Sequence, residues 1–198
     1  MKENTNRMLK RFLVLFLLLL PFTKSTVTNA QRIAINNNAL FDMAGALSAG
    51  VETPLSKKQS FEVYGSLRPW KRGENSVHKH WLVQAQYRLW PCQVMIGFFY
   101  GPYAHVGEFN LGNKDFCLGL LKGLKPYRYE GTLAGVGLGA GYEYVLTKHL
   151  NVGAEVGVGY TYIKYKKYNC EVCGSLKEDD SYNYVGISRA ALSLIYVF

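Results

Sequence analysis

Two neighbouring stretches of the chain alternate apolar and small residues with a period of two. Residues 134–144 place Ala, Val, Leu and Tyr at every second position, with glycine or Glu143 between them. Residues 150–162 repeat the pattern, with apolar residues and tyrosines alternating with glycine, Asn151, Glu155 and Thr161. A period of two indicates β-strands rather than helices. Because only residues 146–149 separate the two stretches, we predict a hairpin.

The two faces of this hairpin differ in an unusual way. One face carries the large apolar residues, and the other carries mostly glycine, which is too small and bare for the surface of a soluble protein. Glycine inside a strand usually marks crowding or close approach. A narrow membrane barrel accounts for both faces, with apolar residues toward lipid and small or polar residues toward a cramped interior. A soluble β-sandwich or barrel is the alternative.

The same alternation predicts six further strands, so that the fold is an all-β, eight-stranded antiparallel up-and-down transmembrane β-barrel. Short connections are expected at 54–58, 90–92 and 146–149, and long loops at 68–79, 108–127 and 166–181. A short turn at 42–45, on the long-loop side, is the exception. Short periplasmic turns and long extracellular loops are typical of outer-membrane barrels. The six further strands are expected near 33–41, 46–53, 61–67, 81–89, 94–101 and 182–198.

The N-terminus predicts export. Basic residues, including Arg7, Lys10 and Arg11, precede the apolar run 12–22, and the small-residue pattern Thr28-Asn29-Ala30 follows. The apolar run is too short to span a bilayer as a helix. We therefore predict a signal peptide over 1–30, cleaved before Gln31, and a barrel domain over 31–198; a retained membrane anchor is the alternative. Part of the formal charge of +9 belongs to the signal peptide, and an exported chain is not expected to bind nucleic acid.

The C-terminus carries a second targeting feature. The chain stops at Phe198, with Tyr196, Leu194 and Leu192 on the same face of the last predicted strand. A terminal phenylalanine at the end of an alternating strand resembles the signal read by the outer-membrane barrel assembly machinery. We expect Phe198 and Tyr196 to form that assembly signal, and the outer membrane to be the location.

The cysteines offer limited chemistry. Cys170 and Cys173 form a CxxC pair in the last long loop, which can be a redox site, half of a zinc site or a small disulfide. No second CxxC completes four zinc ligands, so a loop disulfide or two free thiols is expected. Cys92 and Cys117 fall on opposite rims of the predicted barrel and are not expected to pair. No cofactor or metal is predicted.

The predicted interior carries charges that need partners. Counting faces along each strand places acidic and basic residues inward, and a buried charge in a narrow barrel is costly unless paired. Heights estimated from the turns predict two clusters, Arg88 with one or more of Glu52, Glu62 and Glu143, and Arg189 with Glu155. Since side chains roughly fill an eight-stranded barrel, we expect a plug; a small gated channel is the alternative.

Several segments give the chain a specific resemblance. They include Gly50-Val51-Glu52-Thr53-Pro54-Leu55, His80-Trp81-Leu82-Val83-Gln84 and Ser193-Leu194-Ile195-Tyr196-Val197-Phe198, and together with the other matching segments they cover nearly the whole predicted mature chain. The chain resembles a Bacteroidota family of outer-membrane β-barrels catalogued as a domain of unknown function, akin to the small barrel of outer membrane protein A. The resemblance implies fold and location, and it hints at fimbriae or adhesion through relatives encoded near fimbrial genes.

Two classes of function follow. The first is a small non-enzymatic outer-membrane protein with a structural or surface-interaction role through its extracellular loops. Its partners would be outer-membrane lipid and lipopolysaccharide, the assembly machinery, and a surface or fimbrial protein. The alternative is a lipid-active barrel enzyme of the lipid A deacylase or acyltransferase type. His105 and Ser181 are the residues that could be assigned to such an enzyme, although their spacing does not support it.

Overall fold

A computed structural model describes residues 33–69, 78–112, 128–168 and 176–198. All of these residues belong to the unit Gln31–Phe198. The predicted signal peptide therefore lies outside the described residues, and its cleavage stays a prediction. No helix in the described part of the chain is long and apolar enough to cross a membrane.

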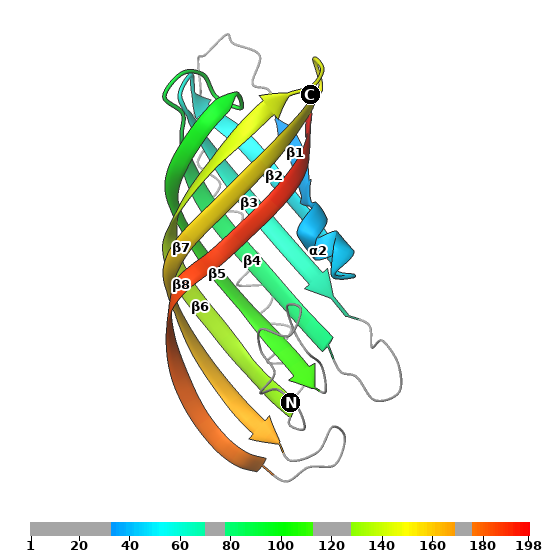
Figure 1. Ribbon diagram of the computed structural model, residues 1–198, viewed down its shortest axis with the longest axis vertical. Helices are drawn as coiled ribbons and strands as arrows, with labels where there is room; N and C mark the ends of the chain where they lie inside the picture. The colour runs from blue at the N-terminus through cyan, green and yellow to red at the C-terminus, as the bar shows by residue number, and fades with distance from the viewer. Residues whose placement is uncertain (1–32, 70–77, 113–127, 169–175) are drawn as a thin grey trace, which may run out of the picture. The chain divides into compact units, whose positions relative to one another are not determined.

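Eight antiparallel strands form a closed barrel in which each strand pairs with its neighbours in the sequence and β1 pairs with β8 (Figure 1). The predicted eight-stranded up-and-down barrel is therefore confirmed. One short helix interrupts the series between β1 and β2. The elements are β1 (Ala34–Asn38), α2 (Ala39–Met43), β2 (Leu47–Ser56), β3 (Gln59–Arg68), β4 (His78–Leu89), β5 (Gly97–Gly112), β6 (Arg128–Val145), β7 (Leu150–Tyr168) and β8 (Leu176–Val197).

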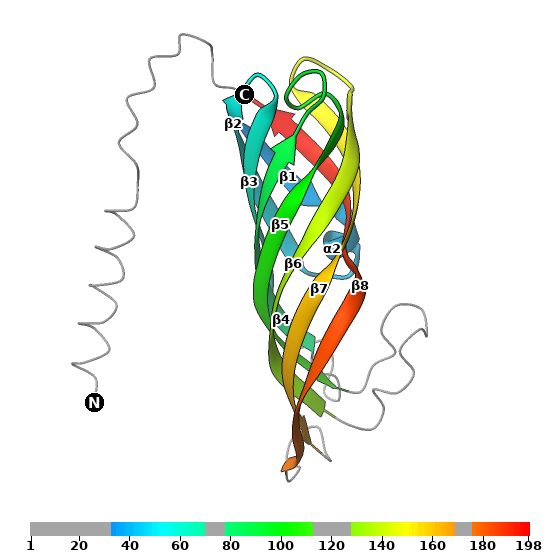
Figure 2. The same cartoon turned by 90° about the vertical axis from the view of Figure 1, so that its left-hand side faces the viewer.

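The strands lengthen steadily around the barrel, from 5 residues in β1 to 22 residues in β8. Connections at one end are short, at 57–58, 90–96 and 146–149. We call this the short-turn end; it also holds the C-terminus (Figures 1 and 2). At the opposite, long-loop end, β5 to β8 extend well beyond β1 to β3.

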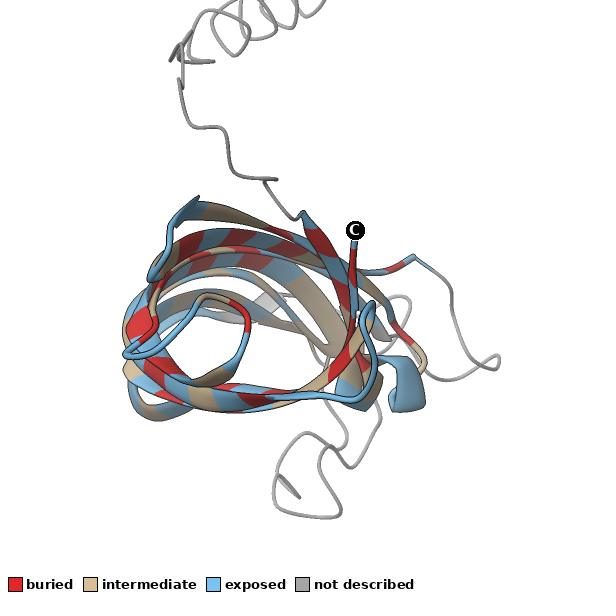
Figure 3. Ribbon diagram, turned by 90° about the horizontal axis from the view of Figure 1, so that it is seen from above, coloured by how far each residue is buried: buried red, intermediate tan, exposed pale blue. Residues whose placement is uncertain are grey.

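Side chains alternate between the interior and the outer surface along every strand, as the buried and exposed bands of Figure 3 show. The glycine face of β6 and β7 points inward, as predicted. Each strand contributes to the outer surface at least one Val, Leu or Ile that is 44% exposed or more. We call the following eleven of these residues the apolar belt: Ile35, Val51, Val63, Val83, Val106, Val136, Leu138, Val156, Val158, Ile187 and Leu194.

The predicted first strand was too long. It ends at Asn38, and residues 39–43 form helix α2 instead of continuing to Phe41. The Asn38 Oδ1 atom accepts a hydrogen bond from the Leu40 backbone N–H at 3.1 Å, which is the helix N-cap arrangement. Asn38 Oδ1 also accepts a hydrogen bond from the Leu192 N–H at 3.2 Å. The same side chain therefore caps the helix and binds the backbone of β8.

Other boundaries were misplaced because strands continue where the apolar alternation stops. The turn expected at 54–58 lies at 57–58, and Pro54 stays in β2 at a register irregularity, where proline is tolerated in a sheet. Strand β5 runs from Gly97 to Gly112 rather than over 94–101. Strands β7 and β8 likewise extend into the predicted loop 166–181, and β6 begins at Arg128, directly after the predicted loop 108–127. Beyond the apolar belt the outward side chains become polar, while the backbone ladder between strands continues.

Candidate functional site: the interior charge cluster and the mouth pocket

Six charged side chains meet inside the barrel, and we call them the interior charge cluster. Each one occupies an inward position on a different strand, and each is at most 9% exposed. Because β2, β3, β4, β6, β7 and β8 each supply one residue, the cluster ties together most of the wall. Its members are Glu52, Glu62, Arg88, Glu143, Glu155 and Arg189.

Arg88 is the centre of this cluster. Its guanidinium lies 2.9 Å from Glu62, 3.2 Å from Glu155 and 3.4 Å from Glu143, and it also donates to Glu52. Its Nε atom donates to Gln86 Oε1 at 3.0 Å. One guanidinium therefore serves four carboxylates from four strands, with its donors aimed at fixed positions.

Arg189 links the second part of the cluster to the first. Its Nη2 atom donates to Glu62 Oε2 at 2.8 Å, and its Nε atom lies 2.8 Å from Glu155 Oε1. Glu62 and Glu155 also contact Arg88. The predicted contacts of Arg88 and of Arg189 are present, but the prediction of two separate clusters was wrong.

The error came from the estimate of height. A height counted in residues from the nearest turn is correct only for strands that run parallel to the barrel axis. Strands in a closed barrel are tilted, and their register is staggered around the ring. Residues at different distances from their turns can therefore reach the same level of the interior, as Glu62 and Arg189 do.

Neutral side chains donate further hydrogen bonds to three of the four carboxylates. Ser60 Oγ donates to Glu52 at 2.5 Å, Asn36 Nδ2 donates to Glu62 at 2.7 Å, and Gln86 Nε2 donates to Glu155 at 2.6 Å. With four carboxylates and two guanidinium groups, the cluster has an excess of acidic groups. This hydrogen bonding offsets part of the desolvation that burial imposes on them.

The glycines of β6 and β7 make room for this arrangement. A Cβ atom at Gly139 would lie 2.6 Å from Glu155 Oε1, and one at Gly157 would lie 2.7 Å from the Tyr103 ring. The Tyr103 hydroxyl in turn lies 2.5 Å from Ser188 Oγ across the interior. The bare inner face is thus filled by side chains that reach over from other strands.

Aromatic side chains close the short-turn end of the interior. Trp90 and Phe99 are each 2% exposed, with ring centroids 4.8 Å apart, and the Arg88 guanidinium lies 4.5 Å above the Phe99 ring. The sequence analysis placed Trp90 in the short connection 90–92, whereas its Nε1 donates to Ser60 Oγ at 2.8 Å inside the barrel. Charges and rings together fill this half of the interior.

A pocket of about 480 Å³ lies at the long-loop end and is lined by β3 to β7. Its lining is centred on the cross-strand row Arg68, His80, Phe109, Gly131 and Tyr165, whose side chains face inward. We call this the mouth pocket. The sequence analysis missed it because it assigned these residues, apart from Gly131 and Tyr165, to loops or turn edges. Extending the period of two beyond the apolar residues would have found the row.

The remaining predicted site residues lie elsewhere. Cys170, Cys173 and Cys117 fall outside the described residues, and Cys92 is exposed with a free thiol. Tyr196 and Phe198 lie on the outer face of the last strand, with ring centroids 4.9 Å apart. Among the described residues no group of three His, Cys, Asp or Glu side chains could hold a metal ion.

His105 and Ser181 are on opposite faces of the barrel wall. His105 is buried inside, where its Nε2 lies 3.1 Å from Thr161 Oγ1, and its ring stacks on Tyr103. Ser181 is exposed and pairs with Lys164, whose side chain is on the outer face of β7. The structure therefore does not bring together the two residues considered for a lipid-active enzyme.

Comparison with known proteins gives one result. Searches against curated proteins and against solved structures returned no match. A family model described as "Protein of unknown function (DUF3575)" matches residues 13–198, which is nearly the whole chain. The chain therefore belongs to the DUF3575 family.

Proposed function

We propose that this protein is a small, non-enzymatic outer-membrane β-barrel with a structural or surface-interaction role. One observation carries the proposal: large apolar side chains cover the outside of the barrel, while arginine and glutamate fill the inside. Exposed apolar surface of this extent marks contact with a membrane or a partner. An outward apolar band around a polar interior is the arrangement of a barrel in lipid.

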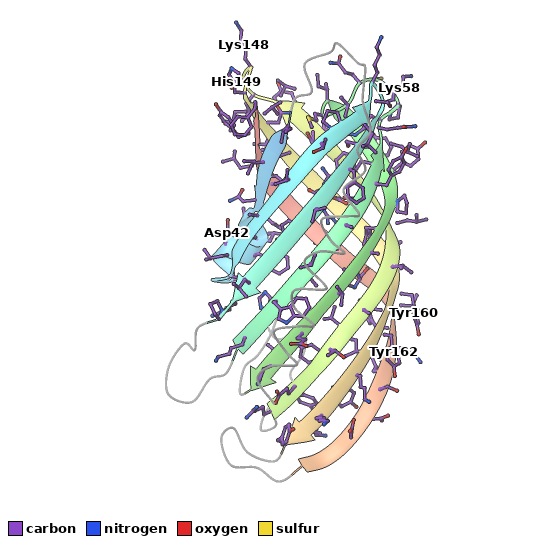
Figure 4. All side chains as sticks on the ribbon, turned by 180° about the vertical axis from the view of Figure 1, so that it is seen from behind. Asp42, Lys58, Lys148, His149, Tyr160 and Tyr162 are labelled. Atoms are coloured by element: carbon purple, nitrogen blue, oxygen red, sulfur yellow. The ribbon has the colours of Figure 1, made fainter. Side chains whose placement is uncertain are left out.

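Aromatic residues support the same reading. On β6 the outward Tyr142 and Tyr144 follow the apolar positions toward the short-turn end. On β7 the outward Tyr160 and Tyr162 follow them toward the long-loop end (Figure 4). Tyrosines at both limits of an apolar band are typical of the two membrane interfaces. Outer-membrane lipid and lipopolysaccharide are the partners that this surface would meet.

The filled interior supports a role at the surface rather than in transport. Because the interior charge cluster and the Trp90–Phe99 pair occupy the lumen, the barrel acts as a rigid support for its long-loop end. In this proposal the signal peptide 1–30 exports the chain and the assembly machinery reads Tyr196 and Phe198. The long loops then face a surface partner, with a fimbrial or adhesive protein as the candidate.

Thiol labelling of intact cells tests the location and the orientation together. Cys92 is exposed at the short-turn end, so its thiol reports on the end of the barrel that the proposal places in the periplasm. In a variant whose other cysteines are replaced by serine, a membrane-impermeant maleimide should label Cys92 only after the outer membrane is permeabilised. An added Asp179→Cys, on the exposed far part of β8, should be labelled in intact cells. Labelling of Cys92 in intact cells, or recovery of the protein in the soluble periplasm, would contradict the proposal.

The lipid-active enzyme predicted as the alternative has less support, since its candidate residues lie on opposite sides of the wall. Mass spectrometry of lipid A from a deletion strain tests it directly. If lipid A acylation is altered in the deletion strain and a copy of the wild-type protein returns it to normal, the enzyme is favoured over the structural role.

A further inference from the structure

Strand β8 is paired along both of its edges over only a small part of its length. On one side β7 pairs with β8 from Leu176 to Tyr196, whereas on the other side β1 pairs only with residues 193–197. In the described part of the chain, no strand pairs with this second edge of β8 beyond Ser193. Figure 1 shows that β1 ends and is followed by α2, while β8 continues far toward the long-loop end.

Next to β1, the side chain of Asn38 takes the place of the missing strand. Asn38 Nδ2 donates to the carbonyl oxygen of Ala190 at 3.1 Å, and Asn38 Oδ1 accepts from the Leu192 N–H at 3.2 Å. The backbone groups of Ala190 and Leu192 therefore point away from β7. One side chain provides the hydrogen bonds that a longer β1 would have supplied.

Farther along β8, the backbone groups of Ile187, Val185 and Asn183 point away from β7. A register shift between β7 and β8 adds one residue, Ser188, so odd-numbered residues now face this edge. The Ile187 carbonyl oxygen accepts a hydrogen bond from the Tyr184 hydroxyl of the same strand at 3.2 Å. Because paired and unpaired positions alternate along an antiparallel strand, Val185 and Asn183 face the same side as Ile187. We call residues 183–187 the open edge.

The open edge lies in the part of the barrel that the proposed function places in lipid. Ile187 belongs to the apolar belt, and the outward side chain of Val185 is 78% exposed. Acyl chains cannot hydrogen-bond to backbone N–H and C=O groups, so sheet edges are not left open to lipid. An unpaired edge is also a template for an added strand. A partner that supplies backbone groups would therefore stabilise this part of the wall.

We propose that the open edge of β8 binds an extended strand of a surface protein, antiparallel to β8 and in line with β1 beyond Asn38. Such a strand would continue the existing β1–β8 ladder along the same edge and in the same direction. It would be apolar at outward positions, beside Val185 and Ile187, and polar at inward positions. The inference deepens the proposed surface role and rests on it for the source of the partner.

A second copy of the barrel does not fit the open edge. Two copies in one membrane share an orientation, so their β8 strands run in the same direction and cannot form an antiparallel ladder. A two-fold axis along the membrane normal also tilts the two strands in opposite senses, so that they cross. The geometry therefore favours a separate strand over a symmetric dimer.

A synthetic peptide with the sequence of residues 155–168 is the probe, because this segment of β7 already pairs antiparallel with β8. Its alternate positions are apolar or aromatic, from Val156 to Tyr162. In an antiparallel arrangement its C-terminal lysines would lie near the exposed Asp179 and Asp180. Fluorescence anisotropy of the labelled peptide with the purified, folded barrel in detergent measures binding, and we expect it to saturate. No saturable binding would overturn the proposal.

Two modified peptides test whether binding occurs through one backbone edge. Both are methylated at every second backbone nitrogen, in opposite phases. An added strand pairs with β8 along one of its two edges, so one modified peptide should bind like the parent and the other at least tenfold more weakly. Equal affinity of the two modified peptides would indicate contact between apolar side chains alone and would overturn the proposal.

Two variants assign the binding to the open edge. Val185→Pro removes a backbone N–H from this edge while leaving the bonds to β7 in place, and proline is tolerated on the free side of an edge strand. It should weaken peptide binding at least tenfold. Val185→Ala is the matched control, since it loses the side chain but keeps the N–H, and its affinity should change less than twofold. Unchanged affinity in a Val185→Pro barrel that remains folded by heat-dependent gel mobility would contradict the site.

Hydrogen exchange of the wild-type barrel keeps the test valid if Val185→Pro does not fold. Bound peptide should slow exchange of the Val185 and Asn183 amides at least tenfold, and unchanged exchange there would contradict the proposal. Light scattering tests the competing occupant, and we expect a monomer. A wild-type dimer that Val185→Pro separates into monomers would show that a second copy occupies the edge and would overturn the proposed partner. The peptide titration uses detergent, so it fails or succeeds independently of the cell-labelling experiment.

Discussion

Arg189 on β8 donates a hydrogen bond to Glu62 on β3 at 2.8 Å, across the interior of the barrel. This bond joins two groups of charges into one cluster, because Glu62 also lies 2.9 Å from Arg88. The cluster therefore behaves as a single unit whose members depend on one another. Stability, closure of the lumen and the role of the glycine face all follow from it.

Arg88→Ala should be the most destabilising single change in the cluster. It leaves four buried carboxylates without their shared cation, and removing one partner of a buried pair typically costs roughly 3–5 kcal/mol. Urea unfolding of the purified barrel measures the loss. Lys58→Ala, an exposed cation at the short-turn end (Figure 4), is the control and should change the free energy of unfolding by less than about 0.5 kcal/mol. Equal stability of the two variants would contradict a structural role for the cluster.

Arg189 and Glu155 should be energetically coupled. Arg189→Ala alone should lower the unfolding midpoint. Glu155→Gln in the same chain should cost less than it does alone, since Glu155 has then already lost the contact with Arg189 and keeps only Arg88 as a cationic partner. We expect a coupling energy of about 0.5–3 kcal/mol in a double-mutant cycle. The exposed pair Arg128–Glu130, 2.7 Å apart, is the matched control and should show less than about 1 kcal/mol. Simple additivity at Arg189 and Glu155 would count against a shared network.

The wild-type barrel should not conduct ions steadily. Side chains roughly fill an eight-stranded barrel, and here the charge cluster and the buried Trp90 and Phe99 rings occupy the short-turn half. Planar-bilayer recording of the purified protein checks this, with a known porin in the same lipid as the positive control. Steady, ion-selective conductance would show that the barrel is a channel and that its interior is not plugged.

Gly157→Ala should destabilise the barrel by about 1–3 kcal/mol, the usual cost of overpacking. Its Cβ would lie 2.7 Å from the Tyr103 ring, which reaches over the glycine face. Gly65→Ala is the control, because its Cβ would meet nothing closer than 3.8 Å. Since the nearest atoms at Gly157 all belong to Tyr103, adding Tyr103→Ala should remove the penalty of Gly157→Ala. Persistence of that penalty without the ring would show that crowding by Tyr103 is not its cause.

Phe198→Ala should reduce the amount of assembled barrel in cells while leaving the stability of the folded protein nearly unchanged. The Phe198 ring is 62% exposed, so its packing contribution is small, and the backbone bond from Phe198 N–H to the Ile33 carbonyl oxygen at 3.0 Å is retained in the variant. Membrane levels in cells and unfolding of the refolded protein measure the two effects separately. Normal levels of the variant in the membrane would remove Phe198 from the assembly signal.

The inward or outward direction of most side chains could be read from the sequence; the exception is the part of β8 before Arg189, where a register shift reverses the alternation. Successive side chains of a strand point to opposite faces, so direction is a local property of the extended backbone. The glycines of β6 and the charges Glu52, Arg88 and Arg189 all lie on the face that the period of two assigned. The short hairpin connection at 146–149 could be read as well, since the alternation stops on both sides of it.

The meeting of inward residues was decided only by the tertiary structure. Barrel closure sets the tilt and stagger of the strands, and these bring Glu62 and Arg189 to one level although their distances from the turns differ. The tertiary structure also determined where the strands end. Residues 108–112 remain in β5 because β4 and β6 supply backbone partners, which no local pattern of apolar residues reports. Helix α2 begins after Asn38 because Asn38 Oδ1 accepts hydrogen bonds from the Leu40 N–H of the helix and from the Leu192 N–H of β8. The edge of β8 lies beside Asn38 only when the barrel closes.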